Sequence, residues 1–412
     1  MDNNVDLNYL IYSLSEALDL VGIDDLNHSK RVAYMVLEMT KEMNLAKEER
    51  IDCVRAALLH DCGVSSTLIH EELLQKVDYA LANDHCVRGF NLLMKSEKLK
   101  KYATCVLFHH TRWKDLIYLE MPDKCKRCAN LIFLCDRIDA IMYQFFNTSV
   151  YKDQHLLARS SVLEKLEEMR DDYFSNELID FFITIAQKES FWFGFRDDIL
   201  RDYFRDFLET TVLEKLATTQ IKEIALLFAY FVDAKSHFTA DHSIYVAKVA
   251  YHLALISGLD EEVAIKLEIA GLLHDIGKLI IPDEILEKSG SLTTDEFNII
   301  KSHVYEAEQI LKNIKGLKKI TSWAASHHEK LNGVGYPYNK QDNIISLPMR
   351  ILAISDIFQA LVQERPYRDS LPLDEVLSIL REMSIKQEID SEVFNTLEAN
   401  GEYFYAIAKG RE

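Results

Sequence analysis

The feature that most constrains this chain is an ordered set of seven histidine and aspartate residues that occurs twice. In the first half the set comprises His28, His60, Asp61, His85, His109, His110 and Asp136. In the second half it comprises His242, His274, Asp275, His303, His327, His328 and Asp356. The offset between matching members rises only from 214 residues at the first histidine to 220 at the last aspartate. Ordered self-similarity of this kind indicates a duplicated domain.

Glycine and proline are scarce in this chain of 412 residues, which contains 13 Gly and 6 Pro. Because these residues interrupt helices, their scarcity beside long Leu-, Ala-, Glu- and Lys-rich stretches favours helix. Apolar residues in segments 223–232 and 265–277 have helical or continuous spacing rather than the alternation of strands. We therefore predict an all-α fold of two tandem domains, 1–205 and 206–412, joined by a helix near 206–216.

The formal net charge of −19 argues against a nucleic-acid partner, because binding to DNA or RNA needs a basic surface. The first ten residues lack the basic and apolar parts of a signal peptide. The longest apolar run, near 224–232, is far shorter than a membrane span. We expect a protein without a membrane partner.

All seven cysteines lie in the first half of the chain. An odd number without a disulfide framework indicates free thiols in a reducing cytoplasm. Cys125 and Cys128 form a CxxC pair that could be half of a zinc site, although a second CxxC is missing. The alternative is that these thiols pack as small apolar groups.

The second-half set has the composition of a metal site. His274 and Asp275 are adjacent at the end of an apolar helical segment, so their side chains diverge by about 100° and reach two neighbouring points. A carboxylate can bridge two metal ions, whereas an imidazole binds one. Imidazole and carboxylate ligands suit iron, manganese, nickel or zinc better than calcium or magnesium. The alternative for any single histidine is a hydrogen-bonded core residue.

Lys278 follows His274 by four residues, so on a continuous helix it would lie one turn away on the same face. A lysine directed at a two-metal centre would pair with a phosphate oxygen. The alternative is a solvated surface lysine.

Three segments of the second half, LLHDIGKLIIPDEIL, HHEKLNGVGYP and RPYRDS, together resemble the HD-GYP family of metal-dependent cyclic dinucleotide phosphodiesterases. The resemblance extends from His237 to about Met383 and implies that both halves are HD-type helical domains. It also implies that the loop Gly335-Tyr336-Pro337 borders the metal pocket. The glycine lets the backbone turn sharply and proline fixes the exit of the loop.

The resemblance assigns roles to individual residues. One metal ion would be bound by His242, His274, Asp275 and Asp356. The other would be bound by Asp275, His303, His327 and His328. Lys278 would contact the scissile phosphate, and Arg365 and Arg368 would contact phosphate or base. Some members carry a glutamate where this chain has Phe238, which would bind a third metal, so we expect two divalent ions, iron or manganese before nickel or zinc.

The first half departs from the family pattern outside its ligand set. Val64 stands where the second half has Lys278, HHTRWKDLIYL replaces HHEKLNGVGYP, and no segment resembles RPYR. It therefore resembles a degenerate HD-GYP domain retained for regulation. Its histidines and aspartates could hold metal or form a hydrogen-bonded polar core.

The tandem arrangement resembles enzymes that degrade 3′3′-cGAMP, while cyclic di-GMP is the commoner substrate of the family. We expect hydrolysis to the linear 5′-phosphorylated dinucleotide, with 3′3′-cGAMP slightly favoured. A non-catalytic cyclic dinucleotide receptor is the main alternative, and a nucleotide phosphohydrolase or a metal-stabilised scaffold fits the GYP segment less well. Monomer and homodimer both stay open.

Overall fold

The computed structural model describes residues 5–20, 27–64, 82–149, 154–235, 241–288, 290–364 and 370–411. Every named element in these ranges is a helix, and β-pairing is limited to isolated bridges. The predicted all-α fold is confirmed. None of the described helices is long and apolar enough to cross a membrane.

Backbone contacts divide the chain into two compact units. The N-terminal unit is Leu7–Glu214, and the C-terminal unit combines Met1–Asp6 with Lys215–Glu412. Leu216 N donates a hydrogen bond of 3.0 Å to Val5 O, which connects the start of the described chain to the C-terminal unit. The junction expected at 205/206 falls inside a helix of the N-terminal unit.

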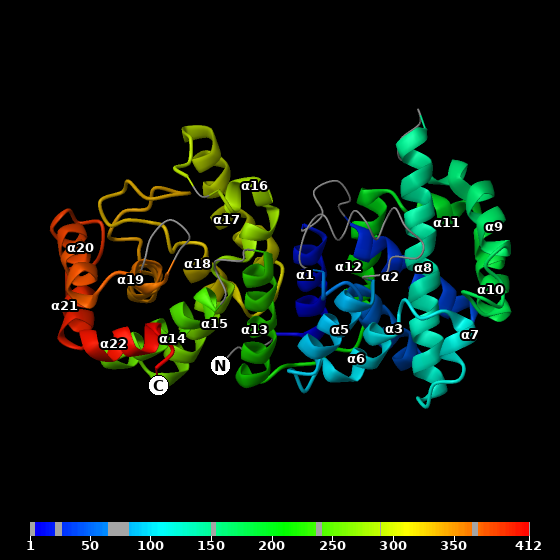
Figure 1. Ribbon diagram of the computed structural model, residues 1–412, viewed down its shortest axis with the longest axis horizontal. Coiled ribbons are helices and arrows are strands. Elements are labelled where there is room, and N and C mark those ends of the chain that lie inside the picture. The colour runs from blue at the N-terminus through cyan, green and yellow to red at the C-terminus, as the bar shows by residue number, and fades with distance from the viewer. Residues whose placement is uncertain are drawn as a thin grey trace. The chain divides into compact units, whose positions relative to one another are not determined.

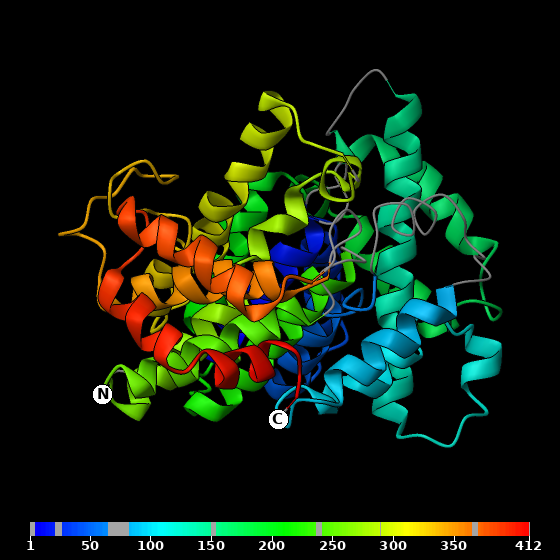
Figure 2. The same cartoon turned by 60° about the vertical axis from the view of Figure 1, so that its left-hand side comes forward.

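Helices account for most of the N-terminal unit (Figures 1 and 2). They are α1 (Leu7–Asp19), α2 (His28–Glu42), α3 (Lys47–Leu58), α5 (Ala82–Leu93), α6 (Lys100–Leu107), α7 (Trp113–Leu116), α8 (Asp123–Thr148), η1 (His155–Ala158), α9 (Arg159–Glu167), α10 (Asn176–Ala186), α11 (Glu189–Phe193) and α12 (Asp197–Thr210). The longest, α8, has 26 residues and packs on α2, α3 and α6.

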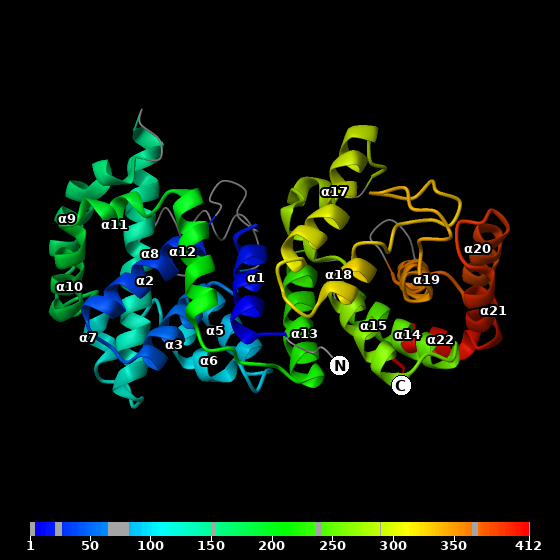
Figure 3. The ribbon, with the colours of Figure 1, turned by 180° about the vertical axis from the view of Figure 1, so that it is seen from behind.

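The described part of the C-terminal unit is also built from helices (Figure 3). Its helices are α13 (Thr218–Lys235), α14 (His242–Ile256), α15 (Glu261–Leu273), η2 (Ile276–Ile280), α16 (Asp283–Leu286), α17 (Thr294–Leu311), α18 (Lys318–Ala324), α19 (Leu347–Val362), α20 (Leu373–Ile385), α21 (Ser391–Ala399) and α22 (Gly401–Ala408).

The duplication is visible in how equivalent helices begin and pack. Helices α2 and α14 each have 15 residues and start at the first histidine of their set. The residue before each start, Asn27 or Asp241, is left-handed, with φ of 76° or 67°. Helix α2 packs on α3 and α8, as α14 packs on α15 and α19. The repeat predicted from sequence is therefore also a structural repeat.

One glycine in each unit lets two backbone segments meet beside the histidines. A Cβ atom on Gly277 would lie 1.9 Å from the carbonyl oxygen of His303. A Cβ atom on Gly63 would lie 1.9 Å from the carbonyl oxygen of His85. Real Cβ contacts are never this short, so only glycine permits the observed approach in either unit.

We expect Gly277→Ala to lower the free energy of unfolding by about 3 kcal/mol, because the new methyl group must push backbone atoms apart. Gly63→Ala should have a similar cost. Thermal unfolding of the purified variants measures this. Gly290→Ala is the control, since a Cβ atom there would meet nothing within 4 Å. A Gly277→Ala protein as stable as the control would contradict the proposed close packing.

Candidate metal centre

The seven histidine and aspartate residues of the C-terminal unit converge from separate helices. They come from the start of α14, the segment between α15 and η2, the middle of α17, the turn after α18 and the middle of α19. Six of them are buried: His242, His274, Asp275, His303, His327 and Asp356. The side chain of His328 is 28% exposed and gives the cluster an edge towards solvent.

Three histidines of the cluster are oriented by their own backbone. The Nδ1 atoms of His274, His303 and His327 lie 2.6, 2.6 and 2.7 Å from the carbonyl oxygens of Gly271, Ile300 and Ala324. A carbonyl can only accept a hydrogen bond, so the proton is on Nδ1. The Nε2 atom of each ring then faces the cluster, which is the orientation that metal coordination requires.

Asp275 lies at the centre of the cluster. Its Oδ2 atom is 3.2 Å from His274 Nε2 and 2.5 Å from Lys278 Nζ. Its Oδ1 atom is 3.4 Å from His303 Nε2. The two oxygens of this carboxylate therefore face different histidines, which is the arrangement of a ligand shared by two cations.

Asp356 lies close to three histidines of the cluster. Its Oδ1 atom is 3.2 Å from His242 Nε2 and 3.7 Å from His274 Nε2, while Oδ2 is 4.0 Å from His328 Nδ1. The Nδ1 atom of His242 lies 3.0 Å from Gln363 Oε1, which supports the ring from outside. His242, His274 and Asp356 thus form a compact group of potential ligands.

The cluster leaves buried polar atoms without hydrogen bonds. His274 Nε2 is close to two carboxylates but makes no hydrogen bond of acceptable geometry, and Asp275 Oδ1 has no hydrogen-bond partner. Burying such atoms unsatisfied is costly, so each one calls for an explanation. Cations bound within the cluster would satisfy these atoms, and the donor set of imidazole and carboxylate fits a divalent transition metal.

Burial and mutual contacts favour the ligand forms of most of these residues. Burial lowers the pKa of His303 to about 3 and that of His328 to about 4, so both rings are neutral at pH 7. Burial opposes ionisation of Asp275, but His274 and Lys278 outweigh it and hold its pKa well below the usual range. His274 differs, because Asp275 and Asp356 outweigh burial and raise its pKa to about 10. A cation would replace that proton.

Lys278 lies beside the cluster, but not on the continuous α-helix with His274 that the spacing predicts. Helix α15 ends at Leu273, and Lys278 lies in the 3₁₀ helix η2, not on a continuous α-helix with His274. Residues three apart eclipse each other in a 3₁₀ helix, which places Lys278 over Asp275. Its side chain is 20% exposed, so the ammonium group faces both the carboxylate and the solvent side of the cluster.

The loop after His328 is held by a buried carboxylate that the sequence analysis did not single out. Glu329 accepts hydrogen bonds of 2.8 Å from the backbone N–H groups of Tyr338 and Lys340. A Cβ atom on Gly335 would lie 2.6 Å from His328 O, so the loop folds directly against the histidine pair. The position of Glu329 beside two histidines was the available signal.

The loop brings Tyr336 to the exposed edge of the cluster. Its ring lies over that of His328, with centroids 4.8 Å apart and planes tilted by 35°. Lys301 Nζ is 5.8 Å from the centre of the Tyr336 ring. The predicted border formed by Gly335, Tyr336 and Pro337 therefore lies beside the ligands. Arg365, Arg368 and Phe238 lie outside the described residues.

A buried aspartate precedes each set of ligands and was also missed. Asp233, near the end of α13, accepts a 3.4 Å hydrogen bond from Ser243. Burial and the neighbouring Asp275 raise its pKa to about 8. In the N-terminal unit Asp19 holds the equivalent position and accepts a 3.0 Å hydrogen bond from Ser29 N. The repeat offset of 214 residues connects the two pairs and could have revealed them.

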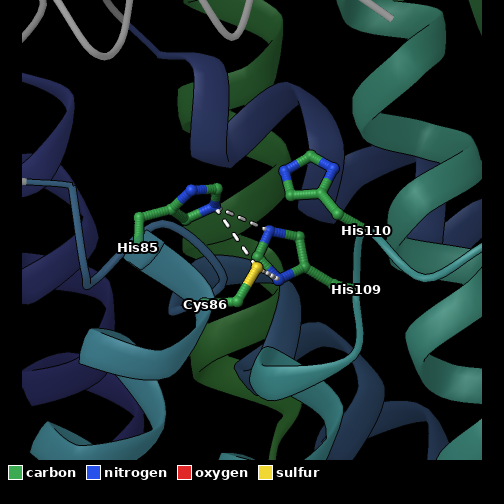
Figure 4. Close-up of side chains that lie close together, drawn as sticks. All are labelled: His85, Cys86, His109 and His110. Atoms are coloured by element: carbon green, nitrogen blue, oxygen red, sulfur yellow. Dashed lines mark hydrogen bonds between the residues drawn. The ribbon is translucent and has the colours of Figure 1, made fainter. Parts of the chain in front are cut away.

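The N-terminal unit gathers its own set. His28 Nε2 lies 3.3 Å from His60 Nε2 and 3.5 Å from both Asp61 Oδ2 and Asp136 Oδ1. Asp61 Oδ1 lies 3.4 Å from His85 Nε2. His109 and His110 complete the group, together with Cys86, whose sulfur is 3.7 Å from His85 Nε2 and 3.6 Å from His109 Nδ1 (Figure 4).

Two arginines distinguish this cluster from the C-terminal one. The buried Arg137 donates to Asp136 Oδ2 from Nη2 at 2.8 Å and from Nε at 3.2 Å. Arg31 binds Asp139 with two hydrogen bonds of 2.6 and 2.8 Å, and Asp139 Oδ2 lies 2.7 Å from His28 Nδ1. At the position of Arg137 the C-terminal unit has Ile357. A fixed guanidinium therefore already neutralises Asp136, and Val64 provides no cation for a phosphate.

Comparison with known proteins also finds one domain in each half of the chain. HD domain family models match residues 25–141 and 224–393. A Vibrio cholerae protein named 3′3′-cGAMP-specific phosphodiesterase 1 is 37% identical over 98% of this chain and 94% of its own length. A Thermotoga maritima protein named cyclic di-GMP phosphodiesterase is 28% identical over 76% of this chain and 77% of its length.

The fold has been seen in a crystal structure of a cyclic GMP-AMP-specific phosphodiesterase from Vibrio cholerae. The two structures superpose with a TM-score of 0.64 at 24% identity, over 96% of this chain and 97% of the other. The identity with phosphodiesterase 1 extends over nearly the whole length of both proteins. The chain belongs to the HD-GYP family of cyclic dinucleotide phosphodiesterases and carries two HD domains in tandem.

Proposed function

We propose that this protein is a metal-dependent phosphodiesterase that hydrolyses 3′3′-cGAMP to the linear 5′-phosphorylated dinucleotide. The observation that carries the proposal is the complete seven-residue cluster of the C-terminal unit, in which Lys278 forms an ion pair with Asp275. Two relatives that match this chain over 94% of their own length are named 3′3′-cGAMP-specific. The choice of this substrate over cyclic di-GMP rests on them.

The C-terminal unit would hold two divalent ions, iron or manganese before nickel or zinc. His242, His274 and Asp356 would bind one ion, and His303, His327 and His328 the other, with Asp275 shared. When bound, such a pair supplies an activated water and positive charge near the reacting phosphate. The rest of the reaction can be assigned to residues of this chain.

Lys278 would bind a non-bridging oxygen of the scissile phosphate. Its ammonium group has three hydrogens, and the contact with Asp275 uses one of them. A preorganised cation beside a phosphate becomes more valuable as negative charge develops in the transition state. Asp275 fixes the direction of this lysine and would lose that function if it were protonated.

Tyr336 and its loop would position the rest of the dinucleotide. The aromatic ring stands at the exposed edge of the cluster, where a base or ribose could pack against it. Arg365 and Arg368 would contact phosphate or base, although they are outside the described residues. Water adds across the phosphodiester bond, the ribose 3′-oxygen leaves as a hydroxyl, and the new terminus is a 5′-phosphate.

We expect His274→Ala with Asp275→Ala to lower 3′3′-cGAMP turnover by at least about 1,000-fold, because the shared ligand is lost. The metal content of the protein should fall with it. Product chromatography and elemental analysis of manganese-reconstituted protein measure both. Binding of 3′3′-cGAMP by the wild type without hydrolysis would favour a receptor instead. Hydrolysis of cyclic di-GMP alone would overturn the substrate assignment.

Lys278→Ala should keep the metal content but reduce the turnover number by about 100-fold, since the lost contact is made mainly in the transition state. Lys278→Arg should restore part of the rate. Lys312→Ala is a matched control, because Lys312 is exposed on the same unit and its ammonium group donates a hydrogen bond to Gln309. Equal rates for Lys278→Ala and the control would remove Lys278 from the mechanism.

The N-terminal unit would regulate the C-terminal one rather than hydrolyse substrate. Its ligand set survives, but Arg137 neutralises Asp136 and Val64 replaces the phosphate-binding lysine. The N-terminal cluster could still hold metal through His85, His109, His110 and Asp61. The free thiols fit a reducing cytoplasm, as the sequence indicated.

We expect His60→Ala with Asp61→Ala to leave turnover within about tenfold of the wild type, as is typical of a coupled but non-catalytic site. The comparison is with His274→Ala and Asp275→Ala on the same substrate in the full chain. If the two double variants are equally inactive, the N-terminal unit is itself catalytic and the regulatory assignment is wrong.

A further inference from the structure

Four cysteines of the N-terminal unit meet where three helices pack together. Cys53 comes from α3, Cys105 from α6, and Cys125 and Cys128 from the first turns of α8. Helices α3, α6 and α8 contact one another in pairs. Cys125 and Cys128 are three residues apart on α8, so their side chains lie on the same face of the helix.

The four thiols are close enough to interact. The Cys105 thiol lies within hydrogen-bonding range of the thiols of Cys125 and Cys128, and the Cys128 thiol within range of that of Cys53. The sulfur of Cys105 is also 4.0 Å from the carbonyl oxygen of Cys125.

Two of these cysteines stand at positions where the fold does not require a thiol. By the repeat, Cys53 and Cys105 correspond to Leu267 and Trp323, which are buried apolar residues of the C-terminal unit. The same positions of the fold can therefore be filled without a thiol. In the N-terminal unit they instead complete the CxxC pair, which the sequence alone left as half of a site.

We propose that Cys53, Cys105, Cys125 and Cys128 bind a single zinc ion that ties α3, α6 and α8 together. Four thiolates are a common ligand set of structural zinc sites, and thiolate ligands exclude the harder cations. Cys53, Cys105 and Cys128 are buried, whereas Cys125 is partly exposed and gives the ion a route of entry.

The local charge suits such a site. A zinc ion with four thiolates carries excess negative charge, which basic neighbours stabilise. Lys124 directly precedes Cys125. Lys126 and Arg127 follow between the two cysteines of the pair. The site is separate from the histidine cluster and independent of the proposed activity.

The test uses the full chain loaded with Co²⁺, whose bonds to thiolate sulfur absorb in the near ultraviolet, whereas His and Asp ligands do not produce this band. We expect the wild type to show the band and Zn²⁺ to displace it. Cys125→Ser, the least buried of the four changes, should remove most of the band and lower the zinc content of the protein by about one ion per chain.

Cys86→Ser is the matched control, because Cys86 is the thiol that lies within the histidine cluster. It should keep the band. A band that Cys86→Ser removes and Cys125→Ser retains would overturn the proposal. So would a disulfide among the four cysteines in protein isolated without oxidant, the visible absorption of an iron–sulfur cluster, or a wild type without a thiolate band. Circular dichroism of each variant establishes that it is folded.

Discussion

The candidate metal centre of the C-terminal unit depends on a hydrogen bond that three of its histidines make to their own backbone. His274, His303 and His327 donate Nδ1–H to the carbonyl three residues earlier, and this fixes which nitrogen faces inward. The same bond recurs at His60 and His109 in the N-terminal unit, with distances of 2.7 and 2.6 Å. Because the backbone sets these rings, the ligands are preorganised before any cation arrives.

The two units have the same arrangement of histidines and aspartates but different charged residues around it. In the C-terminal unit Asp275 pairs with one lysine, and Asp356 faces histidines. In the N-terminal unit Arg137 binds Asp136, and Arg31 binds the added Asp139. Duplication preserved the positions of the ligands, while substitution of their neighbours changed what the pocket can attract. The difference between the two units is therefore electrostatic more than geometric.

Much of this could be predicted from sequence, because the repeat and the scarcity of helix-breaking residues are global signals. They predicted the helical fold and the two sets of histidines and aspartates that the folded chain brings together. The path of Lys278 could not be predicted, since the change from α15 to a 3₁₀ turn after His274 depends on packing around Gly277. Glu329 and Arg137 were missed because their roles arise from contacts that sequence spacing does not encode. Cys53 and Cys105 are far from the CxxC pair in sequence, and only the folded chain brings them to it.

Glu329 accepts hydrogen bonds from two backbone amides and so connects the loop to the histidine pair. The loop that carries Tyr336 begins one residue after His328, and Glu329 pins it at Tyr338 and Lys340. Because Glu329 directly follows His328, a molecule that shifts the loop would also shift His328, a proposed ligand of the cations. Occupancy by cations and affinity for the dinucleotide would then be thermodynamically linked, each strengthening the other by the same factor. A low supply of metal would therefore lower the affinity for the dinucleotide as well as the rate of its hydrolysis.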